Sequence, residues 1–147
     1  MKKKKILLNV YRNFKYLIFK LLYGKIKIIQ SAKKNKKITI KKIYFEGLAV
    51  YKLYNIPNGR LYSDTVNDTA FLLNKSLIRE PSFQYRYQKN LMIVNDNANK
   101  NFVIKKGTPK LIKKIKGNVF SLLAGGAAKN NYWHWLFDVL PRIGLCS

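Results

Sequence analysis

Gly117 to Ser147 read GNVFSLLAGGAAKNNYWHWLFDVLPRIGLCS. Within this stretch, Asn118–Leu123 is short and apolar and is followed by glycines, a pattern that is typical of a buried strand. The small residues around Gly125 and Gly126 then allow the backbone to turn sharply. The sequence therefore predicts a helix next in the chain.

We expect that helix over Tyr132–Leu140. Asn130 or Asn131 can accept a hydrogen bond from an amide of the first turn, and Pro141 is expected to end or kink the helix. At about 100° per residue, one side of the helix is apolar and carries Tyr132, Leu136, Val139, Leu140 and Ile143. The opposite side is polar and carries Asn131, His134, Asp138 and Arg142.

His134 is the only histidine of the chain and lies four residues before Asp138. One helical turn brings the two side chains within reach, so Asp138 can orient the imidazole as a general base. The amides of the Gly125–Gly126 loop, close to a helix N-terminus, suit a phosphate or a substrate oxygen. An ordinary amphipathic helix with a solvent-facing polar side has the same pattern, so both interpretations stay open.

The same segment resembles the signature of glycosyltransferase family 61, in which a helix of the type N-Y-x-H-W-x-x-D-x-L-P-R follows a strand and a short loop. The matching residues are Asn131, Tyr132, His134, Trp135, Asp138, Leu140, Pro141 and Arg142. A looser resemblance over residues 59–85 is to the lead-in of bacterial members that take part in capsular polysaccharide biosynthesis. Together the two resemblances cover roughly residues 44–147 and leave out the basic N-terminus.

The resemblance implies an inverting, nucleotide-sugar-dependent transferase of surface polysaccharide assembly, built from the two Rossmann-like halves of the GT-B fold. Its partners would be a nucleotide sugar and a glycan acceptor. The nucleotide sugar is a co-substrate, and no other cofactor is expected. We predict no metal site, because the chain has no Asp-x-Asp pair.

Sugar transfer needs a base that takes the proton of the acceptor hydroxyl. Either His134 is this base and Asp138 orients it, or Asp138 is the base and His134 binds sugar hydroxyls. Trp133 and Trp135 suit stacking on a sugar ring, although core packing would also explain them. Two further candidates are Arg142, which could pair with Asp138 or hold an acidic acceptor, and Asn131, a helix cap or a ligand.

The length of the chain conflicts with a complete enzyme of this kind. Two Rossmann-like halves need roughly 300 residues, whereas this sequence has 147. We therefore expect an N-terminal, acceptor-side portion, inactive alone, with a β-rich lead-in and the start of one Rossmann-like half. The lone Cys146 has no disulfide partner and fits a reducing cytoplasm.

Three regions are expected: residues 1–30, 31–42 and 43–147. The first has apolar residues at helical spacing among lysines and predicts a basic amphipathic helix, which either lies on the inner face of an anionic membrane or packs on protein. It contains no apolar run long enough to span a bilayer and no signal-peptide pattern. The second, rich in lysine, is expected to be a solvated linker.

The third region is expected to begin with short strands. Strands are predicted at Ile43–Phe45 and Leu48–Leu53, with a turn at Ile56–Gly59. Short strands or loops are expected at Gly59–Ser63, Ala70–Leu73, Leu77–Arg79 and Phe83–Tyr87. Leu91–Val94 and Phe102–Lys105 are expected to pair as a hairpin, and Leu111–Ile115 to lie at the surface. Asp64, Asp68 and Glu80 are expected to cap turns rather than bind metal.

The formal net charge of +24 raises two further function classes, a basic membrane-surface module without catalysis and a nonspecific nucleic-acid-binding protein. All but five of the 30 basic residues are lysines, whereas readers of nucleic-acid sequence rely on arginine. No zinc-finger spacing, RNP motif or GXXG loop is present. The composition therefore disfavours nucleic acid as the partner.

Overall fold

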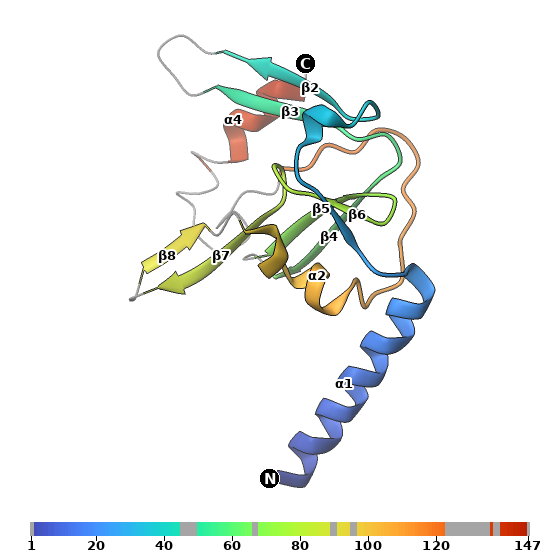
Figure 1. Cartoon of the computed structure of the whole chain (residues 1–147). Helices are drawn as coiled ribbons and strands as arrows, with labels where there is room; N and C mark the ends of the chain where they lie inside the picture. The colour runs from blue at the N-terminus through green and yellow to red at the C-terminus, as the bar shows by residue number, and fades with distance from the viewer. Residues whose placement is uncertain are drawn as a thin grey trace.

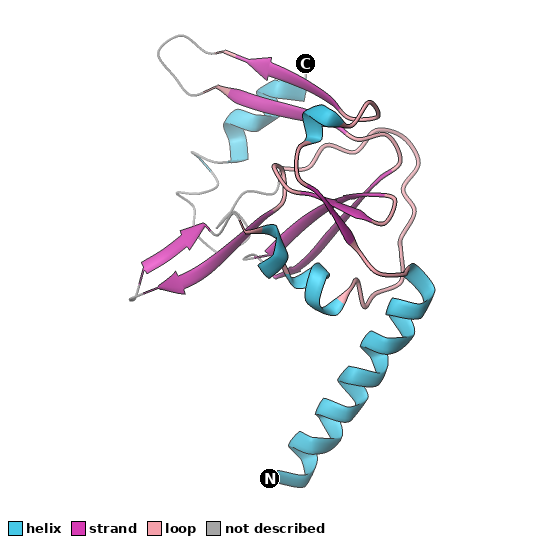
Figure 2. Ribbon diagram, viewed as in Figure 1, coloured by secondary structure: helices cyan, strands magenta, loops and turns pink. Residues whose placement is uncertain are grey.

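The computed structural model describes residues 2–44, 50–65, 68–88, 91–94, 97–122, 136 and 139–146. These residues form a mixed α/β structure with a strand-rich sheet and a few helices (Figures 1 and 2). The N-terminal elements are α1 (Lys2–Tyr23), β1 (Lys27–Ile29), η1 (Ala32–Lys34), β2 (Thr39–Ile43) and β3 (Tyr51–Asn55). The central strands are β4 (Gly59–Thr65), β5 (Asp68–Leu73), β6 (Ser76–Ile78), β7 (Phe83–Gln88) and β8 (Leu91–Val94). The remaining elements are η2 (Ala98–Lys100), α2 (Phe102–Lys106), α4 (Leu140–Ile143) and η4 (Gly144–Cys146).

The main sheet is organised around β5. Its strand order is β1-β6-β5-β7-β8, and β4 also pairs with β5. The strands β6 and β7 both pair with β5, at Leu72↔Leu77 and at Thr69↔Phe83. Among the described strand pairs β1–β6 is the parallel one, so the β-rich lead-in is confirmed, and the repeated parallel βαβ units of a Rossmann-like half are not seen in these ranges.

Alternating residues of the central strands enter two separate cores, as the two-residue period of a strand requires. Leu72 and Leu77 point into the first core and are fully buried. Leu73 and Ile78, one residue further along each strand, enter the second. The first core is completed by Ile26, Tyr62, Ala70 and Val103, and the second by Ala32 and Ile38. The sheet therefore lies between α2 on one face and the β2–β3 hairpin with η1 on the other (Figure 1).

The turn predicted at Ile56–Gly59 is confirmed. The N–H of Gly59 donates to the carbonyl of Ile56 at 2.9 Å, and Asn58 adopts φ 53°. Asparagine tolerates this left-handed conformation better than other residues with a Cβ atom. The four segments between residues 59 and 87 that are expected to be short strands or loops are all strands, with small shifts in their ends.

The predicted hairpin of Leu91–Val94 with Phe102–Lys105 is wrong. The strand β8 pairs with β7, at Tyr87↔Met92 and three neighbouring positions, and Phe102–Lys106 is the helix α2. Asn101 starts this helix because its side chain accepts the N–H of Val103 at 3.1 Å. Gly107, at φ 67°, ends it.

The amphipathic helix expected over residues 1–30 is shorter than predicted and ends at Tyr23. Gly24 adopts φ 75°, and its N–H donates to the carbonyl of Lys20 at 2.9 Å, which closes the last turn. The residues Lys27–Ile29 then form β1 and pair with β6. No helix of the described residues is both long and apolar enough to cross a membrane.

The solvated linker expected over residues 31–42 is instead structured. Ala32 begins η1, and Thr39–Ile43 is the strand β2, paired with β3. The lysines of this stretch are exposed, as predicted, but Ala32 and Ile38 are buried in the second core. The expected strands at 43–45 and 48–53 are consequently displaced to 39–43 and 51–55.

The apolar strand predicted at Asn118–Leu123 is also wrong over its described residues, 118–122. They have no regular secondary structure, and Val119 is 62% exposed. An apolar run becomes a strand only where a neighbouring strand pairs with its backbone, and none of the described strands does so here. The surface position predicted for Leu111–Ile115 is confirmed.

Candidate functional site

The candidate catalytic residues, His134 and Asp138, lie outside the described residues. The same holds for the other candidate positions Gly125, Gly126, Asn131, Trp133 and Trp135. Their roles therefore stay predictions. Arg142 is the one candidate site residue that the structure describes.

Arg142 lies in α4 and is partly buried. Pro141 occupies the first turn of this helix, where a missing N–H costs nothing, so the helical backbone continues beyond the proline to Ile143. The helix that Pro141 is expected to end or kink, Tyr132–Leu140, lies almost entirely outside the described residues, so that expectation stays a prediction. Of the predicted apolar side, Val139 is buried, whereas Leu140 and Ile143 are 42% and 46% exposed.

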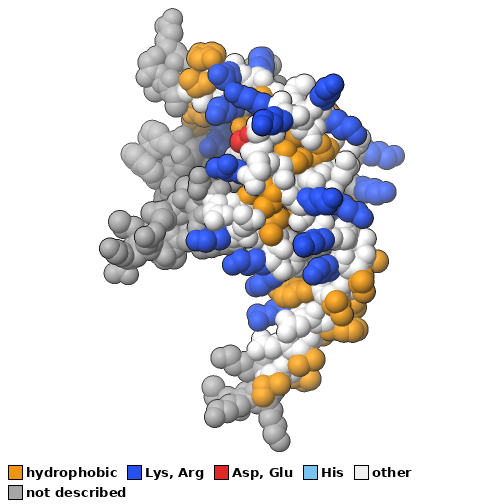
Figure 3. All heavy atoms as spheres, in the orientation of Figure 1, with side chains coloured by type: hydrophobic (Ala, Val, Ile, Leu, Met, Phe, Trp, Pro, Cys, Tyr) orange, Lys and Arg blue, Asp and Glu red, His pale blue; other side chains and the backbone are white. Residues whose placement is uncertain are grey.

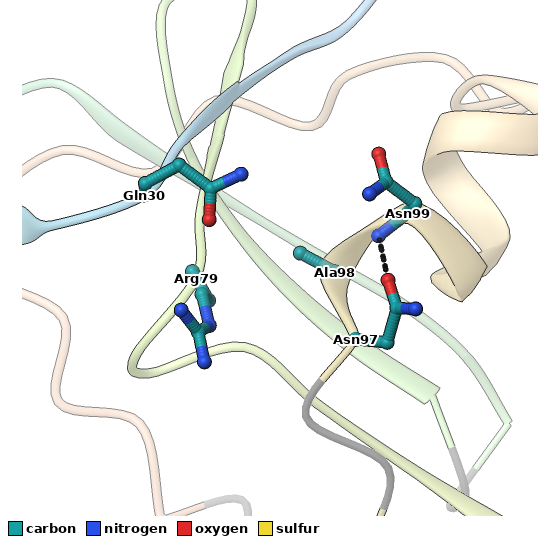
Figure 4. A pocket seen from close by; sticks show the side chains of 5 residues that line it. All are labelled: Gln30, Arg79, Asn97, Ala98 and Asn99. Carbon is teal, nitrogen blue, oxygen red and sulfur yellow. Dashed lines mark hydrogen bonds between the residues drawn. The ribbon is translucent and has the colours of Figure 1, made fainter.

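A polar pocket of about 190 Å³ lies where β1 ends and η2 begins (Figure 4). It is lined by Gln30, Arg79, Asn97, Ala98 and Asn99. One hydrogen bond between backbone groups and one from the backbone to a side chain lie at this pocket. The N–H of Arg79 donates to the carbonyl of Ile29 at 3.1 Å, and Asn97 Oδ1 accepts the N–H of Asn99 at 3.1 Å.

Glu80, which follows the pocket residue Arg79 in the chain, acts as a cap, the role predicted for it without a named partner. Both of its carboxylate oxygens accept the N–H of Ala32, at 2.8 and 3.0 Å, so Glu80 caps η1. Partial burial, and secondarily the negative charge of Glu80, raise the pKa of Tyr54 above its ordinary value. A cap supplied by a residue so distant in sequence leaves no local signal, which is why the partner of Glu80 could not be predicted.

A second, cationic groove of about 350 Å³ lies between α1 and α2. Its lining residues are Arg12, Asn13, Tyr16, Leu17, Lys20, Lys105 and Lys106. Lys106 Nζ lies 5.7 Å from the ring centroid of Tyr16 and 4.9 Å from that of Phe102, so this cation joins the two helices. No sequence pattern indicates this groove, because it depends on how α1 is placed against α2.

Arg60 of β4 makes a similar contact at the end of α1. Its guanidinium carbon lies 5.3 Å from the ring centroid of Tyr23. Burial lowers the pKa of Arg60 from its ordinary value, an effect that the nearby Tyr23 opposes. The polar side of α1 is therefore attached to the body at Tyr16 and at Tyr23.

No protein-family model, no curated protein and no solved structure matches the chain.

Proposed function

We propose that the chain belongs to an inverting glycosyltransferase of surface polysaccharide assembly and contributes to its acceptor-binding side. The observation that supports this proposal is the spacing of Asn131, His134, Asp138 and Arg142 before and after Pro141, which resembles the family 61 signature. The helical backbone of Leu140–Ile143 is compatible with the helical end of that signature. The GT-B fold is part of the proposal.

In the proposed reaction the acceptor hydroxyl attacks the anomeric carbon of a nucleotide sugar. The bond between that carbon and the diphosphate oxygen breaks with inversion, and the nucleoside diphosphate leaves with the bonding electron pair. His134 or Asp138 takes the proton of the hydroxyl, and the other residue of the pair orients the base or binds the sugar. Amides of the Gly125–Gly126 loop would receive a phosphate or sugar oxygen.

The remaining candidates would hold the acceptor. Trp133 and Trp135 present aromatic faces that suit the C–H groups of a sugar ring. Arg142 would form a bidentate contact with an acidic sugar, because its planar guanidinium matches a carboxylate. Asn131 would cap the helix that carries them or bind a sugar hydroxyl.

Sugar transfer by the product of the whole reading frame that contains this chain tests the proposal. The assay offers a panel of nucleotide-sugar donors with an extracted surface polysaccharide as acceptor. We expect His134→Ala and Asp138→Ala each to lower kcat at least about 100-fold, the usual contribution of a positioned acid or base. Asn99→Ala, in the polar pocket, is the control that should keep wild-type turnover.

Two results would overturn the proposal. One is the absence of transfer with every donor and acceptor of the panel. The other is retained turnover in both the His134 and the Asp138 variants, which would exclude them as the acid–base pair.

A further inference from the structure

The helix α1 exposes a continuous apolar stripe. Leu7, Phe14 and Leu21 are 71%, 60% and 77% exposed and recur at intervals of seven residues. The other exposed apolar residues of the helix are Ile6, Leu8, Val10, Tyr11, Leu17, Ile18 and Leu22. Figure 3 shows hydrophobic side chains along the side of α1 that faces away from the body. An exposed apolar surface of this length marks an interaction site.

The opposite side of the helix is already occupied. Lys106 lies over the ring of Tyr16, and Arg60 lies over the ring of Tyr23. These two contacts, almost two turns apart, fix which side of α1 faces the body. The apolar stripe therefore points outward because the opposite side of α1 packs on the body, and not because the helix is detached from it.

The charge around the stripe is entirely positive in the described part of α1, which carries Arg12, Lys15 and Lys20. The first acidic residue of the whole sequence is Glu46. The cationic groove between α1 and α2 adds Lys105 and Lys106 on the body side. An occupant of this surface must consequently be apolar where it meets the stripe and negatively charged at its border.

An anionic bilayer has both properties. Its acyl chains accept the apolar side of a helix that lies in the interface plane, while its phosphate headgroups attract lysine and arginine. A second copy of α1 fits less well, since its own cations would face those of the first copy without an acidic partner. The 22 residues of α1 are too polar to span a membrane, which leaves an orientation along its surface.

We infer that α1 docks the protein on an anionic lipid surface, with its apolar stripe at the boundary between headgroups and acyl chains and the cationic groove beside the headgroups. This inference goes beyond the proposed sugar transfer and does not depend on it. Lipid binding is measured without donor or acceptor, so either proposal can fail alone.

Co-sedimentation of the full chain with phosphatidylcholine vesicles, with and without phosphatidylglycerol, tests the inference. The first variant is Leu7→Gln/Phe14→Gln/Leu21→Gln, which removes the centre of the stripe. The control is Leu111→Gln/Ile115→Gln, because these side chains are 80% and 64% exposed but lie outside α1. A third variant, Lys20→Gln/Lys105→Gln, removes two charges of the groove. Circular dichroism verifies that all variants keep their secondary structure.

The wild-type chain should bind the anionic vesicles. The stripe variant should lose at least about tenfold in partition coefficient, and the control should bind like wild type. The charge variant should lose about fivefold per lysine on anionic vesicles. Wild-type binding by the stripe variant would overturn the inference, since attraction by charge alone would then explain it. A failure of the wild-type chain to bind anionic vesicles would also overturn it. So would a dimer that forms through the stripe and prevents vesicle binding. The same holds if the chain prefers RNA to vesicles and the stripe variant keeps that preference.

Discussion

Glu80 and Ala32 join two parts of the chain that are 48 residues apart. Both oxygens of the Glu80 carboxylate accept the backbone N–H of Ala32, at 2.8 and 3.0 Å. Ser31, at the N-cap position of η1, makes no capping bond with its own side chain. Glu80 thus replaces a local cap and holds the lysine-rich segment against the sheet, where Ala32 is fully buried.

The substitution Glu80→Ala is expected to lower the free energy of unfolding by about 1 kcal/mol, the usual effect of losing a helix cap. Urea denaturation followed by circular dichroism measures it. Glu80→Gln keeps a carbonyl oxygen that can accept the Ala32 N–H, so its loss should be smaller. Equal stability of Glu80→Ala and wild type would contradict a capping role.

The raised pKa of Tyr54 is expected to lower the free energy of unfolding at high pH. Partial burial, and then the charge of Glu80, raise its folded-state pKa above the ordinary value of about 10. The unfolded chain releases the phenol proton first, so the stabilisation is complete below about pH 10 and is lost as the pH rises through the raised pKa.

Urea denaturation near pH 8 and about pH 11 should therefore show a larger drop for wild type than for Tyr54→Phe, which has no phenol proton. Glu80→Gln should reduce the drop, because it removes the negative charge that disfavours the phenolate. An identical drop in wild type and Tyr54→Phe would argue that Tyr54 does not titrate differently in the two states.

The side chain of Ser82 accepts a hydrogen bond from β5 at a position between the strands β6 and β7, which both pair with β5. Its Oγ accepts the N–H of Phe71 at 2.9 Å, where the turn between β6 and β7 interrupts the ladder. Ser82→Ala leaves this N–H without its acceptor and should cost about 1–3 kcal/mol in the free energy of unfolding. Ser76→Ala, in the neighbouring strand β6, is the matched control and should cost less. Faster hydrogen exchange at the Phe71 amide would locate the effect.

Asn101 and Asn97 are two asparagine caps that differ in burial. Asn101 is 2% exposed; its Oδ1 accepts the N–H of Val103, and its Nδ2 donates to the carbonyl of Thr69 at 3.5 Å. Asn97 is exposed and accepts the N–H of Asn99. Asn101→Ala should cost about 2 kcal/mol more than Asn97→Ala, since it leaves buried polar groups unpaired.

Thermal unfolding of the two variants measures the difference. Asn101→Asp keeps the capping oxygen and loses the donor to Thr69, so its stability should lie between wild type and Asn101→Ala. A loss at Asn97 as large as that at Asn101 would show that burial does not set the cost of these caps.

The strands between residues 59 and 87 could be predicted because their signals are local. Each is a short run of apolar or β-branched residues that ends at a turn, and Asn58 and Asn74 adopt the positive φ that such turns require. The amphipathic pattern of α1 is local as well. Asn101, by contrast, directly precedes a segment that the sequence predicts to be a strand, although asparagine also starts helices.

The candidate site depended on residues 123–138 and on a family resemblance, and only Arg142 among its members lies in the described part of the chain. The polar pocket and the cationic groove could not be predicted. Arg79 and Asn97 both line the first, and Lys20 and Lys105 both line the second, because separate elements pack together. No sequence spacing reports such pairs.

Neighbouring residues alone set the helical period of α1, the turns and the strands of the central sheet, because they control backbone conformation. The positive charge and the apolar stripe of α1 are also properties of the sequence. The capping of η1 by Glu80, the packing of the lysine-rich segment on one face of the sheet and the outward direction of the stripe arise from tertiary contacts. These outcomes depend on long-range contacts, which burial and hydrogen bonding select after the local elements have formed.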